Sequence, residues 1–218
     1  MSRRGRFGIL AGALLAAALV VGLALAQRGM GGYGNGYGPG AYGPGMMGIG
    51  VGVRGSQVLD WSGAQATIEA GAAGASVDVA SNTVSFTGAN VTLDVVAVQP
   101  GEPDTTFEIA GLVDPTVKVP RGALVTLRLV NMDYGADMPH GVVITRLPPP
   151  YTVMPMPMMG GMGPGISPLV ARSADDLRSA RYAAAAVRFR AAVPGTYYYL
   201  CQVPGHARDG MYGKLIVE

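Results

Sequence analysis

Short runs rich in β-branched residues, separated by proline and glycine, fill the chain from about residue 58 onwards. Turn signals such as Pro100-Gly101 and Pro194-Gly195 lie between the runs, as is typical of strands. Many short strands with almost no helical periodicity predict an antiparallel β-sandwich or barrel. The expected strands are Val77–Val79, Thr83–Phe86, Val91–Val98, Thr105–Ile109, Thr116–Val119, Leu124–Asn131, Val142–Thr145, Ala185–Arg190, Thr196–Cys201 and Lys214–Val217.

Two segments interrupt this pattern. The alanine-rich stretch Trp61–Ala73 predicts a helical turn or two. The stretch Pro148–Arg181 is too long and too rich in proline and glycine for a hairpin connection, so we expect a long loop there. Within that loop, Asp175–Tyr182 has the pattern of a short exposed helix. Loops of this length are usually functional or mobile.

The N-terminus has the organisation of an export segment. Residues 1–26 begin with three arginines, continue through the uncharged run Phe7–Ala26 and end in Ala24-Leu25-Ala26, a small-x-small cleavage pattern. The alternative is an uncleaved membrane anchor, because about 20 uncharged residues can span a bilayer. Residues 27–57 are rich in glycine, tyrosine and methionine and predict a flexible tether. The folded domain is then expected over residues 58–218.

Charge and ligand counts exclude several protein classes. The chain has 16 Lys+Arg against 14 Asp+Glu, and without the three arginines of residues 1–26 the balance is 13 against 14, a net charge of −1. Such a domain lacks the basic surface that nucleic-acid binding needs. The chain has one cysteine and two histidines. These are too few for an intrachain disulfide, a zinc finger, an iron–sulfur cluster, a multi-copper oxidase or a binuclear thiolate-bridged copper centre.

The same few residues form a ligand pattern. Cys201, His206 and Met211 are each five residues apart, in the connection between the last two expected strands, and His140 precedes the strand Val142–Thr145. Two imidazoles and a thiolate make a trigonal set, and a thioether adds a weak axial contact. This set suits copper that moves between Cu(II) and Cu(I). Each residue alone has an ordinary structural explanation, but together they predict one mononuclear copper site.

These motifs resemble those of the blue copper proteins, or cupredoxins. The resemblance covers about residues 83–218 and is densest in Pro149–Pro155 and in Gly195–His206, continuing through Gly210–Lys214. It implies a Greek-key β-sandwich, a type 1 (blue) copper site and an exported electron carrier of a respiratory chain. The resemblance implies His140, Cys201, His206 and Met211 as the copper ligands. Sulfocyanin-like proteins, which combine an N-terminal hydrophobic segment with such a domain, are a nearby group.

One position departs from the cupredoxin pattern. Gly141 stands where cupredoxins commonly place Asn or Ser beside the first histidine ligand. We therefore expect no side-chain hydrogen bond from this position between the two ligand loops.

The leading functional hypothesis is a one-electron carrier that is not an enzyme. Its expected partners are redox proteins such as cytochromes or a terminal oxidase, in the periplasm or at the outer face of the cytoplasmic membrane, and the domain is expected to be monomeric. The alternative is a copper storage or delivery protein, prompted by methionines in the tether and in the segment Met154–Met162. That segment either packs on the sandwich or forms an apolar rim near the copper. A small copper enzyme is a weaker third hypothesis, because a fourth ligand at Met211 leaves no open position.

Overall fold

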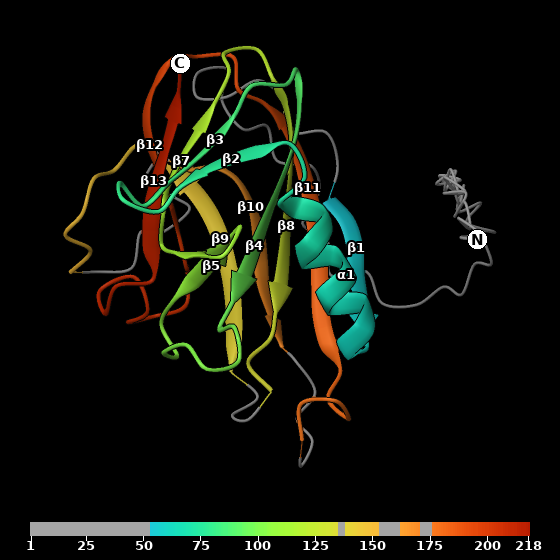
Figure 1. Ribbon diagram of the computed structural model, residues 1–218. Helices are drawn as coiled ribbons and strands as arrows, with labels where there is room; N and C mark the ends of the chain where they lie inside the picture. Colours follow the sequence, from blue (N-terminus) through green and yellow to red (C-terminus); the bar gives the residue numbers. More distant parts are fainter. Residues whose placement is uncertain (1–52, 135–137, 153–161, 171–175) are drawn as a thin grey trace, which may run out of the picture. The chain divides into compact units, whose positions relative to one another are not determined.

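The protein forms two β-sheets and one helix in the computed structural model, which describes residues 53–134, 138–152, 162–170 and 176–218 (Figure 1). One sheet has six strands in the order β1-β11-β8-β4-β5-β6, and the other has seven in the order β10-β9-β12-β13-β7-β3-β2. The element bounds are β1 Val53–Leu59, α1 Trp61–Gly71, β2 Ala75–Asp78, β3 Thr83–Phe86, β4 Asn90–Ala97, β5 Phe107–Ile109, β6 Leu112–Val113, β7 Thr116–Val119, β8 Leu124–Asn131, β9 Pro139–Thr145, β10 Met162–Val170, β11 Tyr182–Arg190, β12 Gly195–Leu200 and β13 Tyr212–Val217.

The predicted β-sandwich is confirmed, although its sheets are mixed. In the described part of the chain, β4 pairs with β8 in parallel, and β7 pairs in parallel with both β3 and β13. The remaining pairs are antiparallel. Parallel neighbours arise because connections that cross between the two sheets return the chain in the same direction.

Alternation of side chains along the strands builds the core between the sheets. In β8, Val125, Leu127 and Leu129 are fully buried, while the residues between them are partly exposed. Their partners in the other sheet include Val84 and Val117, also fully buried. Because successive strand residues point to opposite faces, these valines and leucines meet in one apolar layer.

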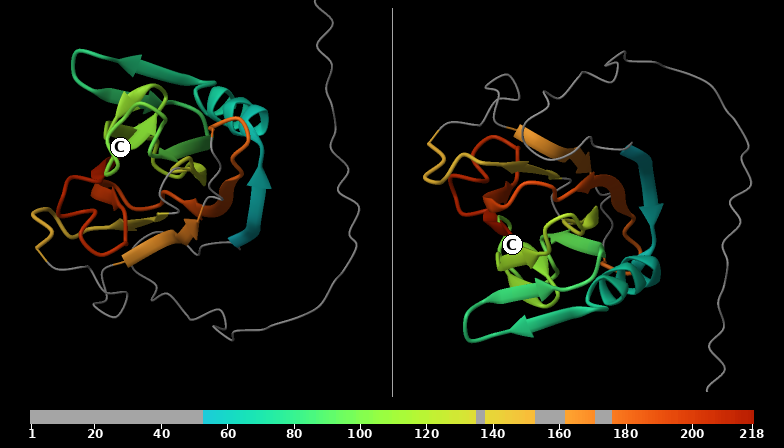
Figure 2. Two further views of the ribbon diagram at one scale, coloured as in Figure 1. Left: turned by 90° about the horizontal axis from the view of Figure 1, so that it is seen from below. Right: turned by 90° about the horizontal axis from the view of Figure 1, so that it is seen from above.

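The helix α1 covers part of the outer face of the six-stranded sheet. It lies beside β1 and β4 (Figures 1 and 2). Val96 and Val130 point away from the main core and pack with Ala64 of the helix in a second apolar cluster. Asp60 is the N-cap of the helix, and its carboxylate accepts a hydrogen bond from the Gly63 N–H at 2.8 Å. The expected helical turn or two between residues 61 and 73 is therefore a helix of 11 residues.

Three expectations from the sequence need correction. The first strand begins at Val53, inside the stretch assigned to the tether. The segment expected as one long loop contains β10, which pairs with β9. No helix forms over residues 176–182: residues 176–179 make a bend and turn, and Tyr182 starts β11. The Asp176 carboxylate accepts hydrogen bonds from the Arg178 and Ser179 N–H groups, a local pattern that competes with helix formation.

The methionines at positions 154, 156, 158 and 159 lie outside the described residues, and so do residues 1–52.

In the described part of the chain, no helix has the length and apolar character needed to cross a membrane.

Asp114 is a carboxyl group whose surroundings disfavour its charge. Its Oδ1 accepts a hydrogen bond from the Phe107 N–H at 3.0 Å, and its own N–H donates to the Phe107 carbonyl at 2.7 Å. Burial raises the pKa of this carboxyl to about 7, although the hydrogen bond from Phe107 opposes the rise. The folded state thus holds a proton on Asp114 at pH values where the unfolded chain has lost it.

We predict that the free energy of unfolding falls less in Asp114→Asn than in the native protein when the pH is raised. The pKa is higher in the folded state than its ordinary value of 3.8, so the stabilising contribution is complete below pH 4 and is lost as the pH rises towards 7. Asparagine offers the same acceptor without a charge and tolerates the positive φ of 45° at this position. After allowance for solvent screening, the variant should gain at least about 1 kcal/mol over the native protein between pH 4 and pH 8. Urea unfolding at the two pH values measures this difference, and a constant difference would contradict the assignment.

Candidate metal centre

Two neighbouring strands bring the predicted ligands to one end of the sandwich. His140 is the second residue of β9, and Cys201 directly follows β12. The two strands pair antiparallel, with Leu200 opposite Val143 and Tyr198 opposite Thr145. Because the strands run in opposite directions, the beginning of β9 lies beside the end of β12. The loop between β12 and β13 then places His206 at the same end.

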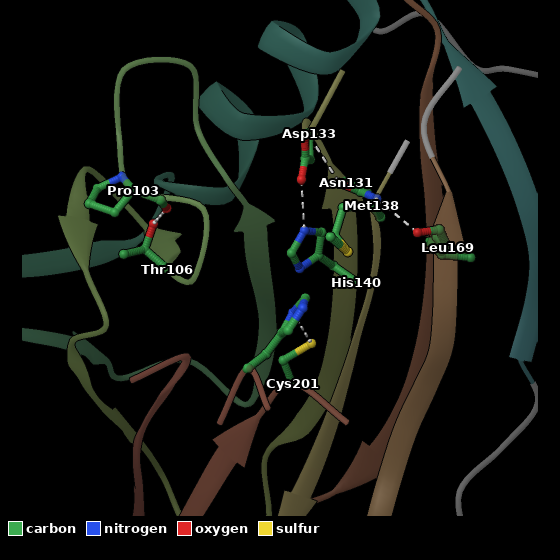
Figure 3. A network of polar contacts seen from close by, with 9 residues as sticks. Pro103, Thr106, Asn131, Asp133, Met138, His140, Leu169 and Cys201 are labelled. Carbon is green, nitrogen blue, oxygen red and sulfur yellow. Dashed lines mark hydrogen bonds and ion pairs between the residues drawn. The ribbon is translucent and has the colours of Figure 1, made fainter. Parts of the chain in front are cut away.

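The ligand atoms of His140, Cys201 and His206 lie within 4.8 Å of one another. The Cys201 Sγ is 3.6 Å from the His206 Nδ1, and the two imidazole rings have their centroids 4.9 Å apart. Figure 3 shows His140 and Cys201 in this cluster. Donors that bind one ion at about 2 Å in a trigonal or tetrahedral arrangement are about 3.3 to 3.5 Å apart. The Cys201–His206 separation is already close to this, so the cluster must contract mainly around His140 to hold a metal. The structure therefore brings together three of the four predicted ligands as one group.

The free nitrogen of His140 fits a metal ligand. The Nε2 atom of this ring lies 3.2 Å from the Asp133 Oδ2, whereas the Nδ1 atom is buried and has no hydrogen-bond partner. A buried polar atom without a partner is costly, so it indicates a missing binding partner. With a cysteine sulfur and a second imidazole beside it, this nitrogen completes a donor set suited to copper.

Met211 lies next to two of these ligands through its main chain. Its carbonyl accepts a hydrogen bond from the Cys201 N–H at 3.0 Å, and its N–H donates to the His206 carbonyl at 2.9 Å. The Met211 side chain is fully buried in the same core cluster as Cys201. These contacts place the residue at the site, and its role as axial ligand stays a prediction.

Burial keeps both imidazoles in the form that binds metals. It lowers the pKa of His140, although the hydrogen bond that the ring makes to the Asp133 carboxylate acts in the opposite direction, and it also lowers the pKa of His206. Both rings are therefore neutral at pH 7, as metal ligands must be. His140 and Cys201 are 0% and 1% exposed, whereas His206 is partly exposed. The site thus opens to solvent through the ring of His206.

Two main-chain hydrogen bonds reach the sulfur of Cys201. Burial raises the pKa of this thiol, and the N–H groups of Val203 and Gly141 oppose the rise by hydrogen bonding to the sulfur. The Gly141 N–H belongs to the His140 segment, so it links the two ligand-bearing segments. The sequence predicts only that no side-chain hydrogen bond is made from position 141, and this link is made by the main chain instead.

Gly141 also makes room for a side chain that the sequence analysis did not identify. The Gln202 Nε2 atom donates to the Ile166 carbonyl of β10 at 2.7 Å. A Cβ atom at position 141 would lie 2.7 Å from this Nε2, 2.9 Å from the Ile166 oxygen and 3.0 Å from the Pro168 nitrogen. The absence of a side chain at Gly141 therefore lets β9, β10 and the Cys201 segment approach closely.

Comparisons with known proteins agree with this geometry. Residues 73–218 match the model of a family described as copper binding proteins, plastocyanin/azurin family. The chain is 33% identical over 175 residues to rusticyanin of Acidithiobacillus ferrooxidans, which covers 78% of this chain and 87% of that protein. It is 36% identical over 142 residues to rusticyanin of Acidithiobacillus ferridurans, covering 64% of this chain and 70% of that protein. The motifs in residues 149–155 and 195–214 are likewise similar to those of rusticyanin.

The solved structures agree as well. A structure of rusticyanin from Thiobacillus ferrooxidans has a TM-score of 0.63 with 30% identity, over 75% of this chain and 97% of that one. A structure of reduced rusticyanin has the same TM-score of 0.63 with 29% identity, over 75% of this chain and all of that one.

We predict that Gly141→Ala destabilises the fold by about 1 to 3 kcal/mol, because the added methyl group meets main-chain atoms of β10 that cannot rotate away. Denaturant unfolding of the variant measures the loss. Removing the flexible neighbour as well, in Gly141→Ala with Gln202→Ala, should recover only part of it. Full recovery in the double variant would show that Gln202 alone causes the crowding.

Proposed function

We propose that this protein, which belongs to the plastocyanin/azurin family of copper-binding proteins, carries single electrons in a respiratory chain outside the cytoplasm. The chain is a rusticyanin-like cupredoxin, and its cofactor is one copper ion. The proposed ligands are His140, Cys201, His206 and Met211. The observation that carries the proposal is the convergence of the only cysteine and both histidines in one cluster, in which His140 and Cys201 are buried.

The proposed donor set favours electron transfer over catalysis. Bound copper supplies a one-electron change between Cu(II) and Cu(I), and four protein ligands leave no position for a substrate. The residues around it limit rearrangement: His140 is held by pairing with Leu169 of β10, and Cys201 by N–H groups of Val203 and Gly141. Ligands that are held by strand pairing and hydrogen bonds keep nearly the same positions in both oxidation states.

His206 is the proposed route for the electron. His140 and Cys201 are almost fully buried, whereas the His206 ring is partly exposed and Pro204 beside it is exposed. A partner protein that docks at this end would reach the ring edge without opening the sandwich.

The location and organisation of the whole chain are part of the proposal. Residues 1–26 would direct export as a signal peptide or hold the protein as an anchor, the residues from 27 to the start of β1 at Val53 would form a tether, and the copper domain would follow. The basic start and uncharged run of the N-terminal segment support this organisation. Cytochromes or a terminal oxidase, at the periplasmic side of the cytoplasmic membrane, are the partners that this location would offer.

Copper storage or delivery is the second candidate. The methionine-rich stretch Met154–Met162 favours it, since thioethers bind Cu(I). The burial of His140 and Cys201 favours retention of the ion instead, because release requires the ligand loops to open.

We predict that copper stays bound through repeated oxidation and reduction. The copper-loaded protein should show an intense visible absorption in the oxidised state and regain at least about nine tenths of it after each cycle, because the ligands are held in place in both states. Repeated chemical reduction and reoxidation in the presence of a Cu(I) chelator checks this. Transfer of most of the copper to the chelator on the first reduction would favour the delivery protein. In the control variant Cys201→Ser the thiolate absorption should be absent, since the sulfur that produces it is gone.

We also predict opposite effects of two substitutions at Met211. Met211→Gln introduces an oxygen donor that favours Cu(II), so the reduction potential should fall, while Met211→Leu removes the donor and the potential should rise. Each change should correspond to about a tenfold or larger change in the relative affinity for the two oxidation states, which is about 59 mV for one electron. Voltammetry measures both. A potential of the glutamine variant at or above the native value would exclude Met211 as the axial ligand.

A further inference from the structure

A buried polar frame surrounds the side of His140 that faces away from the other ligands. The side-chain amide of Asn131, at the end of β8, donates hydrogen bonds to the Met138 carbonyl at 2.9 Å and to the Leu169 carbonyl at 2.8 Å (Figure 3). Its Oδ1 accepts the Asp133 N–H at 3.0 Å. Asn131 is fully buried, and both its side-chain nitrogen and its side-chain oxygen make hydrogen bonds. It therefore fastens the end of β8 to the beginning of β9 and to β10.

Asp133 is held by this frame against the imidazole. The residue is 7% exposed, and its Oδ2 lies 3.2 Å from the Nε2 of His140 (Figure 3). Among the ion pairs of the described residues, His140 is the only partner of Asp133. Arg208, the arginine of the ligand loop, pairs with Asp209 instead. The negative charge of Asp133 thus lies beside the His140 ring, and no Lys or Arg of the described residues forms an ion pair with it.

The contact has a consequence for the ring itself. A carboxylate can only accept a hydrogen bond, so the Nε2 atom must carry the proton and the Nδ1 atom keeps its lone pair. That lone pair is the unpartnered atom beside Cys201 and His206. Asp133 therefore holds the tautomer and the orientation that binding through Nδ1 requires.

The contact also has an electrostatic consequence. A negative charge close to a redox centre stabilises the state with the higher positive charge, which here is Cu(II). The interaction is weakly screened because the carboxylate is almost fully buried. An asparagine at the same position would offer the same acceptor oxygen without the charge, so the two effects of Asp133 can be separated.

We propose that Asp133 is a positioning residue that selects the Nδ1 atom of His140 for copper and, through its charge, lowers the reduction potential of the site. The inference rests on the proposed role of His140 as a copper ligand. It adds a residue outside the ligand set, with two functions that different substitutions remove.

The first experiment separates charge from hydrogen bonding. The copper-loaded Asp133→Asn protein is compared with the native protein by voltammetry at pH 7. Loss of the buried charge should change the relative affinity for Cu(I) and Cu(II) by about tenfold in favour of Cu(I), which raises the potential by about 59 mV. The matched control is Asp209→Asn, which removes the same charge from a side chain that is 47% exposed and paired with Arg208. Its shift should be less than half as large. An unchanged potential in Asp133→Asn, or an equal shift in both variants, would overturn the electrostatic function.

The second experiment tests positioning without measuring the potential. In Cu(I)-loaded protein, nitrogen-15 NMR detects the Nε2–H of His140 and its exchange with solvent. The native protein and Asp133→Asn should both retain a slowly exchanging Nε2–H, since both offer an acceptor oxygen. In Asp133→Ala the exchange should be at least about tenfold faster. Equal protection in the alanine and native proteins would show that Asp133 does not hold the ring.

The outcome also distinguishes this inference from the proposed function. If the Asp133 variants keep the visible absorption and cycle reversibly with unchanged potential and ring exchange, the role of Asp133 fails and the electron carrier stands. If the native protein itself loses copper on reduction, the carrier function fails first.

Discussion

The pairing of β9 with β12 is the constraint on which the metal centre depends. His140 and Cys201 are 61 positions apart in the sequence, and the register of these two strands places them at one end of the sandwich. A shift of one residue would turn every side chain of a strand to its other face. The register is fixed by the buried core side chains on the strands, including Ile144 and Tyr199. The geometry of the site is thus set by apolar packing away from the ligands.

Within this frame, the surroundings of the site act in opposite directions on the copper. Burial disfavours charge, and the two N–H groups that reach the sulfur of Cys201 draw electron density from it, so both favour the less charged Cu(I) state. The buried carboxylate at Asp133 favours Cu(II). The reduction potential is therefore a balance, and the sequence of the ligands alone does not determine it.

The cluster of His140, Cys201 and His206 could be predicted from the sequence because the chain contains so few candidates. One cysteine and two histidines leave little choice, and the structure brings those three together. The strands Thr83–Phe86, Thr116–Val119 and Leu124–Asn131 were predicted with their observed bounds, since their β-branched residues and flanking turns give a clear local signal.

The features that were missed depend on contacts between distant segments. The strand β10 contains two prolines and two glycines, a composition that weakens the local signal for a strand. It is tolerated because β10 lies at the edge of its sheet, where one side needs no hydrogen-bonding partner. In the same way, nothing local marks Asp133 or Gln202, because their roles come from His140 and from the Ile166 carbonyl, which belong to other elements.

The unequal burial of the ligands connects the fold with the proposed transfer of electrons. An ion can leave such a site only if several ligands separate, and His140 and Cys201 are enclosed by strands and by hydrogen bonds to their neighbours. An electron needs only a short path to the surface, and the partly exposed ring of His206 provides one. The loop that carries His206 is itself fastened at both ends, since the Met211 main chain bonds to Cys201 and to His206. Exposure is thus confined to one ligand on a short, closed loop, an arrangement that supports electron exchange with the copper retained.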